Sequence, residues 1–308
     1  MVKVLAPELA SDGAFRARFG REAAAMSKLP RHPNVVAVLA VDVVAPTPHL
    51  VMELVEGCSL RQRLQQGPLP AALVARYGRD AARGLAAVHA AGLIHRDVKP
   101  ANLLLDAASD RVLVADFGLA KDEFLSGLTA PGQLLGTSFY MAPEQWDEAL
   151  EEDARIDVFA LGVTLYELAC GRPPFVGADM FEVAELALEG EYEPLDEVAD
   201  VPVALARAID QALQPDPEER TPRADVLAAD LEAVLNGGLT SVPALVPWAR
   251  DERTGRVGEA PPAPAAPGEV CFLLGRRRTT LGSDPGCDMV LAGAGVAPLQ
   301  YAASQCFS

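Results

Sequence analysis

Residues 95–102 read His95-Arg96-Asp97-Val98-Lys99-Pro100-Ala101-Asn102, the most informative segment of this 308-residue chain. Within six residues, the segment brings together a carboxylate, an ammonium group and a carboxamide. Pro100 prevents a regular helix there, because proline lacks the backbone N–H that a helix interior uses. Taken alone, such a segment is more simply explained as a polar loop, so its meaning depends on the motifs that come later in the chain.

Two further motifs occur after it in a fixed order. Asp116-Phe117-Gly118 begins fourteen residues after Asn102, behind the apolar run 112–115, and Glu144 of Ala142-Pro143-Glu144 lies 28 residues after Asp116. Together the three motifs resemble the catalytic loop, the metal-binding loop and the Ala-Pro-Glu motif of the protein kinases. One motif alone is weak support, whereas the ordered set is very specific.

The resemblance implies a role for each polar residue of these motifs. Asp97 would orient the substrate hydroxyl and accept its proton, and Lys99 would place a positive charge beside the transferred phosphate. Asn102 and Asp116 would hold Mg²⁺, a hard cation that prefers oxygen ligands. Such residues suit phosphoryl transfer, because its transition state spreads charge over oxygens that the protein must position and stabilise.

Two details resemble the Ser/Thr kinases rather than the tyrosine kinases. Lysine stands two residues after Asp97, and Gly136-Thr137 precedes the Ala-Pro-Glu motif. By this resemblance Thr137 contacts Asp97 and Lys99, and the expected substrates are proteins with Ser or Thr hydroxyls. A small-molecule kinase of related fold is the weaker alternative.

A helix is expected over 12–29, where four residues share one face: Phe15, Phe19, Glu22 and Met26. Glu22 therefore lies on an apolar stripe. Either its carboxylate reaches water at the edge of the stripe, or it is partly buried and needs a cationic partner. Lys3 is the candidate partner, since Val2-Lys3-Val4-Leu5 resembles the kinase strand whose lysine binds the ATP α- and β-phosphates.

Residues 49–57 resemble the strand and hinge that bind the adenine ring of ATP. The resemblance makes Met52 the gatekeeper, although simple core packing explains a methionine there equally well. The backbones of Glu53 and Val55 would bond to adenine, and Leu104 would lie beneath the ring.

Two further matches suggest structural roles. Asp157 resembles the helix-start aspartate that braces the catalytic-loop backbone, and its alternative is an ordinary acidic residue at a helix N-terminus. Arg220 resembles the arginine that pairs with the Ala-Pro-Glu carboxylate, which is Glu144 in this chain.

Residues 119–141 correspond to the activation segment of the kinases. Arg96 precedes the catalytic aspartate, and this arrangement implies control by activation-loop phosphorylation, with Arg96 binding the added phosphate. Thr129 is the first candidate phosphosite and Ser126 the second. An unmodified polar loop is the alternative.

The pattern predicts an α+β, protein-kinase-like two-lobe fold over 1–236, with an incomplete β-rich N-lobe and a helical C-lobe. Strands are expected at 35–44 and 49–55, and long helices at about 70–91, 155–170, 178–189 and 203–213. The resemblance begins at the third kinase strand, so the first two strands and the Gly-rich loop are expected to be missing. The chain is then either an N-terminally truncated kinase or a lidless pseudokinase scaffold that acts as a binding module. The intact set of catalytic residues favours the first.

The end of the chain has a different texture. Residues 237–269 are a Pro/Ala-rich linker, and 270–308 are expected to form a short all-β segment. Residues 281–300 resemble the start of a forkhead-associated (FHA) domain, although an unstructured β-rich tail fits equally well. The positions that bind phosphothreonine in that family read Ser283, Ala297 and Gln300, so no phosphopeptide binding is expected.

Composition excludes several classes of function. Half of the residues are hydrophobic, which argues against a disordered chain. The net charge of −17 argues against nucleic-acid partners and anionic membranes. Five scattered cysteines argue against a disulfide framework, and no apolar run is long enough for a membrane span. A cytoplasmic enzyme is expected, with ATP and Mg²⁺ as cofactors and with a kinase–kinase dimer for autophosphorylation among its partners.

Overall fold

The computed structural model describes residues 1–5, 13–44, 48–116, 138–146, 153–237, 269–272, 281–282 and 289–290. The chain divides into two compact units. The first contains Met1–Lys28, Ala37–Leu54 and Ala263–Ser308, and the second contains Leu29–Val36 and Val55–Pro262.

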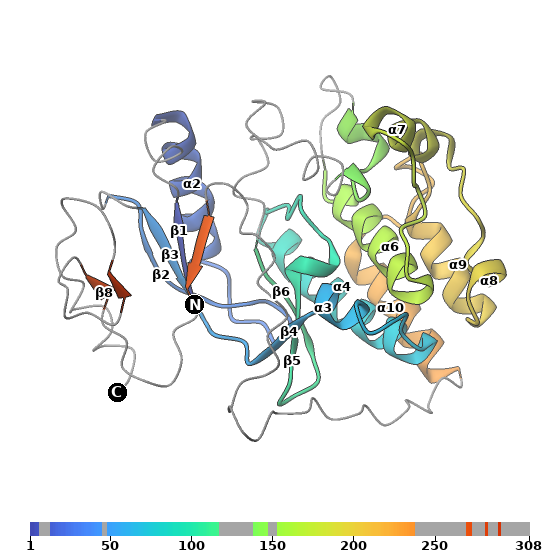
Figure 1. The fold of residues 1–308 in the computed structure, drawn as a ribbon, viewed down its shortest axis with the longest axis horizontal. Helices are drawn as coiled ribbons and strands as arrows, with labels where there is room; N and C mark the ends of the chain where they lie inside the picture. Colours follow the sequence, from blue (N-terminus) through green and yellow to red (C-terminus); the bar gives the residue numbers. More distant parts are fainter. Residues whose placement is uncertain are drawn as a thin grey trace. The chain divides into compact units, whose positions relative to one another are not determined.

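The first unit contains an antiparallel sheet with the strand order β2-β3-β1-β7 (Figure 1). Its strands are β1 (Val2–Leu5), β2 (Val38–Asp42), β3 (His49–Met52) and β7 (Glu269–Phe272). The short strands β8 (Leu281–Gly282) and β9 (Met289–Val290) pair in parallel. The two central strands alternate between buried and half-buried residues, as expected when one face of a sheet covers a core.

One helix, α2 (Gly13–Met26), packs against this sheet within the first unit. It buries Phe19, Ala23 and Met26. The guanidinium of Arg16 donates to the carbonyl of Val43 from Nε at 3.1 Å and from Nη2 at 3.0 Å. This contact ties the helix to the end of β2, and the predicted helix and strand pair are confirmed with shorter bounds.

The second unit consists mainly of helices around one hydrophobic core. Its helices are α3 (Leu60–Leu64), α4 (Ala71–Ala90), α6 (Arg155–Cys170), α7 (Met180–Glu189), α8 (Leu195–Val198), α9 (Val203–Ala212) and α10 (Ala224–Asn236). The four long helices predicted for this region are confirmed as α4, α6, α7 and α9.

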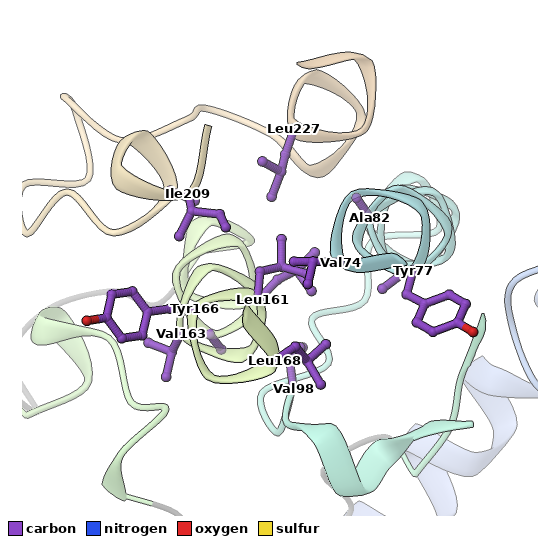
Figure 2. Packing of buried hydrophobic residues seen from close by; sticks show 14 of the residues in the cluster. Val74, Tyr77, Ala82, Val98, Leu161, Val163, Tyr166, Leu168, Ile209 and Leu227 are labelled. Atoms are coloured by element: carbon purple, nitrogen blue, oxygen red, sulfur yellow. The ribbon is translucent and has the colours of Figure 1, made fainter. Parts of the chain in front are cut away.

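Helix α6 forms the centre of this core. Every residue from Ile156 to Ala169 is buried, because α4, α9 and α10 all pack against it. Figure 2 shows Ile209 of α9 and Leu227 of α10 directed toward Leu161 of α6. A helix that is apolar on all sides is stable only when it is surrounded in this way.

A small sheet in the second unit positions the catalytic motifs. Its order is β4-β5-β6, with β4 at Gly57–Ser59, β5 at Leu103–Asp106 and β6 at Val112–Val114. The 3₁₀ turn η1 (Pro100–Asn102) leads directly into β5, and Asp116 comes closely after β6. The antiparallel pairing Leu103↔Val114 therefore brings the two motifs together.

None of the described helices is long and apolar enough to cross a membrane.

Candidate active site

Asp97 is held in place by the side chains of its own loop. Lys99 Nζ donates to the Asp97 carboxylate at 2.9 Å. Asn102 Nδ2 donates to Asp97 Oδ2 at 2.7 Å and to the Asp97 backbone oxygen, also at 2.7 Å. The Asp97 side chain is 21% exposed, so the oriented carboxylate is partly accessible to solvent.

Asn102 and Asp116 come together through backbone pairing. The N–H of Ala115 donates to the carbonyl of Asn102 at 2.9 Å, which places Asn102 beside the residue that precedes Asp116. Asp116 itself has φ 52°, a left-handed conformation that costs free energy in a non-glycine residue and that is concentrated at functional sites. An amide oxygen and a carboxylate are thus offered from adjacent segments.

This donor set fits Mg²⁺. The ion usually takes one or two protein carboxylates and completes its shell with water and substrate phosphates. The described residues contain no cluster of three or more His, Cys, Asp or Glu side chains that could hold a metal ion without such help.

The imidazole of His95 links the catalytic loop to the chain before Asp116. His95 Nδ1 accepts the backbone N–H of Asp97 at 3.2 Å, and its Nε2 lies 2.9 Å from the carbonyl oxygen of Ala115. A carbonyl can only accept, so this pattern requires the His95 proton on Nε2. One buried ring therefore orients both segments that carry the site.

Asp157, at the start of α6, holds the backbone of the catalytic loop by hydrogen bonds. It accepts the backbone N–H groups of His95 and Arg96 at 2.7 Å each, and His89 Nε2 lies 2.7 Å from its Oδ2. Arg96 has φ 66°, which is a strained, left-handed conformation for a non-glycine residue. The hydrogen bond from its N–H to Asp157 holds the loop in this conformation.

The charge of Asp157 is maintained by these partners. Burial alone would raise the pKa of the Asp157 carboxyl. The hydrogen bond from His89, the electrostatic effect of the neighbouring His95 ring and the backbone donor outweigh burial, so the net effect is a lowered pKa.

Glu144 and Arg220 form a buried, bidentate ion pair. The guanidinium donates to the two carboxylate oxygens at 2.7 and 2.9 Å, and the Arg220 side chain is completely buried. It also donates to the carbonyls of Gln214, Pro215 and Arg155 and lies 4.9 Å from the ring centroid of Phe159. The pair anchors the Ala-Pro-Glu motif to the helical core.

Sequence reasoning missed a second polar cluster, which surrounds Glu167 of α6. The Tyr140 hydroxyl donates to Glu167 Oε2, and Arg61 of α3 donates to Glu167 Oε1 at 3.0 Å. Burial raises the pKa of the Glu167 carboxyl even though both partners oppose the shift. The sequence did contain a signal for this cluster, because a carboxylate inside an otherwise apolar helix needs a partner.

His89 was also missed, since nothing in its local sequence points to Asp157.

The residues expected to hold ATP are distributed over both units. In the first unit, Lys3 is buried in β1 opposite Leu50, and Met52 is buried at the end of β3. The N–H of Glu53 donates to the carbonyl of Ala37 at 2.9 Å, so adenine could bond only to the Glu53 carbonyl.

The other residues expected to hold ATP are only partly described by the structure. In the second unit, Val55 precedes β4 and Leu104 lies half-buried in β5. Glu22 lies within α2, and its side chain is outside the described residues. Thr137, Thr129 and Ser126 also lie outside them.

The fold and the order of these motifs are those of a protein kinase domain. The family model for the protein kinase domain matches residues 1–231, and the chain belongs to this family. Its α+β, two-lobe fold, predicted from the sequence, is thereby confirmed.

Curated relatives are bacterial serine/threonine-protein kinases. PknL of Mycobacterium tuberculosis strain H37Rv is 38% identical over 235 residues, which are 76% of this chain and 58% of PknL. PkaA of Streptomyces coelicolor is 38% identical over 239 residues, 77% of this chain and 43% of PkaA. PknB of Mycobacterium leprae is 38% identical over 243 residues, 77% of this chain and 39% of PknB. The chain thus spans about half the length of the curated relatives that it matches.

Proposed function

We propose that this chain is an ATP-dependent Ser/Thr protein kinase that transfers the γ-phosphoryl group to hydroxyls of protein substrates. The observation that supports this most strongly is the oriented carboxylate of Asp97, held by Lys99 and Asn102, with Asp116 after the adjoining strand. The bacterial relatives named Ser/Thr kinases support the choice of hydroxyl.

Each residue of the loop has a task in this proposal. Asp97 orients the attacking hydroxyl and accepts its proton, so the substrate hydroxyl must lie within hydrogen-bond distance of the Asp97 carboxylate. Lys99, already beside Asp97, offers positive charge to the transferred group. Asn102 and Asp116 are the proposed Mg²⁺ ligands. Bound Mg·ATP supplies the phosphoryl group, and the cation neutralises charge on the phosphate oxygens.

The proposed nucleotide contacts follow the resemblance to the protein kinases. Lys3 binds the α- and β-phosphates and is paired with Glu22. Met52 is the gatekeeper, the backbones of Glu53 and Val55 bond to adenine, and Leu104 supports the ring. The burial of Lys3 favours this assignment, because a buried ammonium group needs anionic partners.

Regulation by activation-loop phosphorylation is part of the same proposal. Arg96 is exposed, and its backbone is held by Asp157. In this proposal its guanidinium binds a phosphate added to Thr129 or Ser126. A kinase–kinase dimer would deliver that phosphate in trans. Cytoplasmic placement and the FHA-like segment remain predictions.

Phosphoamino-acid analysis tests the proposal. The full chain is incubated with γ-labelled ATP, MgCl₂ and casein, and the labelled products are hydrolysed and separated. Phosphoserine or phosphothreonine is the expected product, and EDTA abolishes it. Nucleotide binding without labelled product would instead support the scaffold, and label on tyrosine would contradict the assigned specificity.

A further inference from the structure

Glu53 makes two hydrogen bonds to one residue, Ala37, directly beyond the end of the β2–β3 pairing. The last pair of that ladder is Val38↔Met52, so Ala37 and Glu53 are the next two residues to face each other. The N–H of Glu53 donates to the carbonyl of Ala37 at 2.9 Å. The N–H of Ala37 donates to Oε1 of the Glu53 side chain at 3.0 Å. All four residues belong to the first unit.

The second of these bonds departs from the usual antiparallel pattern. In a hydrogen-bonded antiparallel pair, the two facing residues exchange both bonds between their N–H groups and their backbone carbonyls. Glu53 donates as this pattern requires, but the N–H of Ala37 bonds to the Glu53 carboxylate instead of the Glu53 backbone carbonyl. An ionised carboxylate is a stronger acceptor than a carbonyl, which explains why the side chain takes this N–H.

The exchange of acceptors leaves the backbone carbonyl of Glu53 available. Among the described residues, no N–H or O–H group donates to it. Backbone carbonyls that are shielded from water normally have a donor. This carbonyl follows the buried Met52, and it belongs to one of the proposed adenine contacts.

A simpler explanation is a surface glutamate that bonds to any N–H close to it. Bonds of that kind are usually local, within about four residues along the chain. Glu53 is half-buried, however, and Ala37 lies 16 residues away on the neighbouring strand. The backbone bond between the same two residues fixes the carboxylate at one position of the ladder.

We infer that the Glu53 side chain is a positioning residue for the nucleotide: it takes the ladder bond that its own backbone carbonyl would otherwise take, and so keeps that carbonyl free for the amino group of adenine. This inference rests on the proposed kinase function. A carbonyl can only accept, so it favours a base that offers a donor. Adenine offers its exocyclic amino group, whereas the base of inosine triphosphate (ITP) has an oxygen at that position. The preference for ATP over ITP should therefore depend on the Glu53 side chain.

Two uncharged variants isolate the acceptor. Glu53→Gln keeps a side-chain oxygen that can accept the N–H of Ala37, whereas Glu53→Met has a similar length and only a weakly accepting sulfur. In Glu53→Met, the N–H of Ala37 should turn to the backbone carbonyl of Glu53, because a shielded donor rarely stays unpaired. Both variants lose the negative charge, so any repulsion between the carboxylate and the triphosphate cancels when they are compared.

Isothermal titration calorimetry of the full chain with Mg·ATP and Mg·ITP tests the inference without relying on catalysis. Glu53→Met should bind Mg·ATP about 3- to 10-fold more weakly than Glu53→Gln, which is the effect of one neutral hydrogen bond. Binding of Mg·ITP should differ between the two variants by less than about twofold, because ITP offers no donor to the carbonyl. Equal affinities of the two variants for Mg·ATP, or equal losses for both nucleotides, would overturn the inference.

Steady-state kinetics separates positioning from a general structural role. Glu53→Met should raise KM for ATP relative to Glu53→Gln and leave kcat at saturating ATP within about twofold, because the side chain does not act on the transferred group. A fall in kcat with an unchanged KM would contradict this. Val44→Ser changes an 84% exposed side chain of the same unit and should alter neither value. Thermal melting checks that the variants are folded.

The wild-type chain distinguishes failure of this inference from failure of the kinase proposal. If the wild type transfers label to casein while the Gln and Met variants share the same nucleotide affinities, the inference fails and the kinase proposal stands. If the wild type binds Mg·ATP without transferring label, the kinase proposal fails, and the binding comparison decides the role of Glu53. A wild type that binds neither nucleotide would overturn both.

Discussion

Replacing Arg220 with alanine should strongly destabilise the second unit. The substitution removes both donors from the buried Glu144 carboxylate, which is only 8% exposed. It also leaves the carbonyls of Gln214, Pro215 and Arg155 without this donor. A buried charge that loses its partner costs about 3–5 kcal/mol.

This free energy converts into a measurable shift. In a domain of 150–250 residues, 1 kcal/mol lowers Tm by about 2–4 °C, so Arg220→Ala should lower Tm by roughly 6–20 °C. Differential scanning calorimetry on the full chain measures the shift. The matched control is Arg223→Ala, since Arg223 pairs with Asp225 while both side chains are more than half exposed. Exposed pairs contribute little, so the control should stay within about 2 °C of the wild type.

A double substitution identifies the cause of the loss. If the stranded carboxylate is responsible, Glu144→Leu combined with Arg220→Met should recover part of the lost stability, since no unpaired charge remains. A Tm for Arg220→Ala within the range of the Arg223→Ala control would refute the reasoning. The reasoning would also be refuted if the double variant lost more stability than the two single variants lose together.

Other contacts support three smaller predictions. Asp157→Asn should lower the free energy of unfolding by about 2–4 kcal/mol in urea denaturation at pH 7. Because folding lowers the pKa of this carboxyl from 3.8, the difference in free energy between wild type and variant should shrink as the pH falls through the lowered pKa. A difference that stays constant with pH would contradict this prediction. Gly84→Ala should destabilise the folded chain by about 1–3 kcal/mol, although alanine favours helices, because the added Cβ would lie 2.3 Å from the carbonyl oxygen of Asn34. An unchanged midpoint of urea denaturation would count against that close approach. Burial raises the pKa of the Cys58 thiol to about 11, so only about one thiol in a thousand is ionised at pH 8. Peptide mapping of the folded chain after treatment with iodoacetamide should therefore find Cys58 unlabelled. Rapid labelling of Cys58 in the folded chain would disprove its burial.

The sequence predicted those parts of the site whose signal is local or whose motif is long. Asp97, Lys99 and Asn102 stand within six residues, and the structure shows them in mutual contact. The structure likewise shows the ion pair between Glu144 and Arg220, although 76 residues separate them. Two distinctive motifs, each recognisable by itself, made that distant pair predictable.

Other contacts had no comparable signal. The pairing of β7 with β1 joins residues more than 260 positions apart, and neither strand carries a pattern that specifies its partner. The contact of Tyr140 with Glu167 depends on how α6 packs against the segment that carries Tyr140, which only tertiary structure determines. His89 is an ordinary polar residue of a helix until α6 brings Asp157 to it.

The central claim is that Asp97 carries phosphoryl transfer in this chain. The most direct measurement is the rate of label transfer from saturating Mg·ATP to a Ser/Thr protein, compared between the wild type and Asp97→Asn. Asparagine keeps the size of the side chain but cannot accept the proton, so the rate should fall about 10²–10⁴-fold while Mg·ATP still binds. Equal rates in the two proteins would show that the activity does not depend on this carboxylate and would contradict the account.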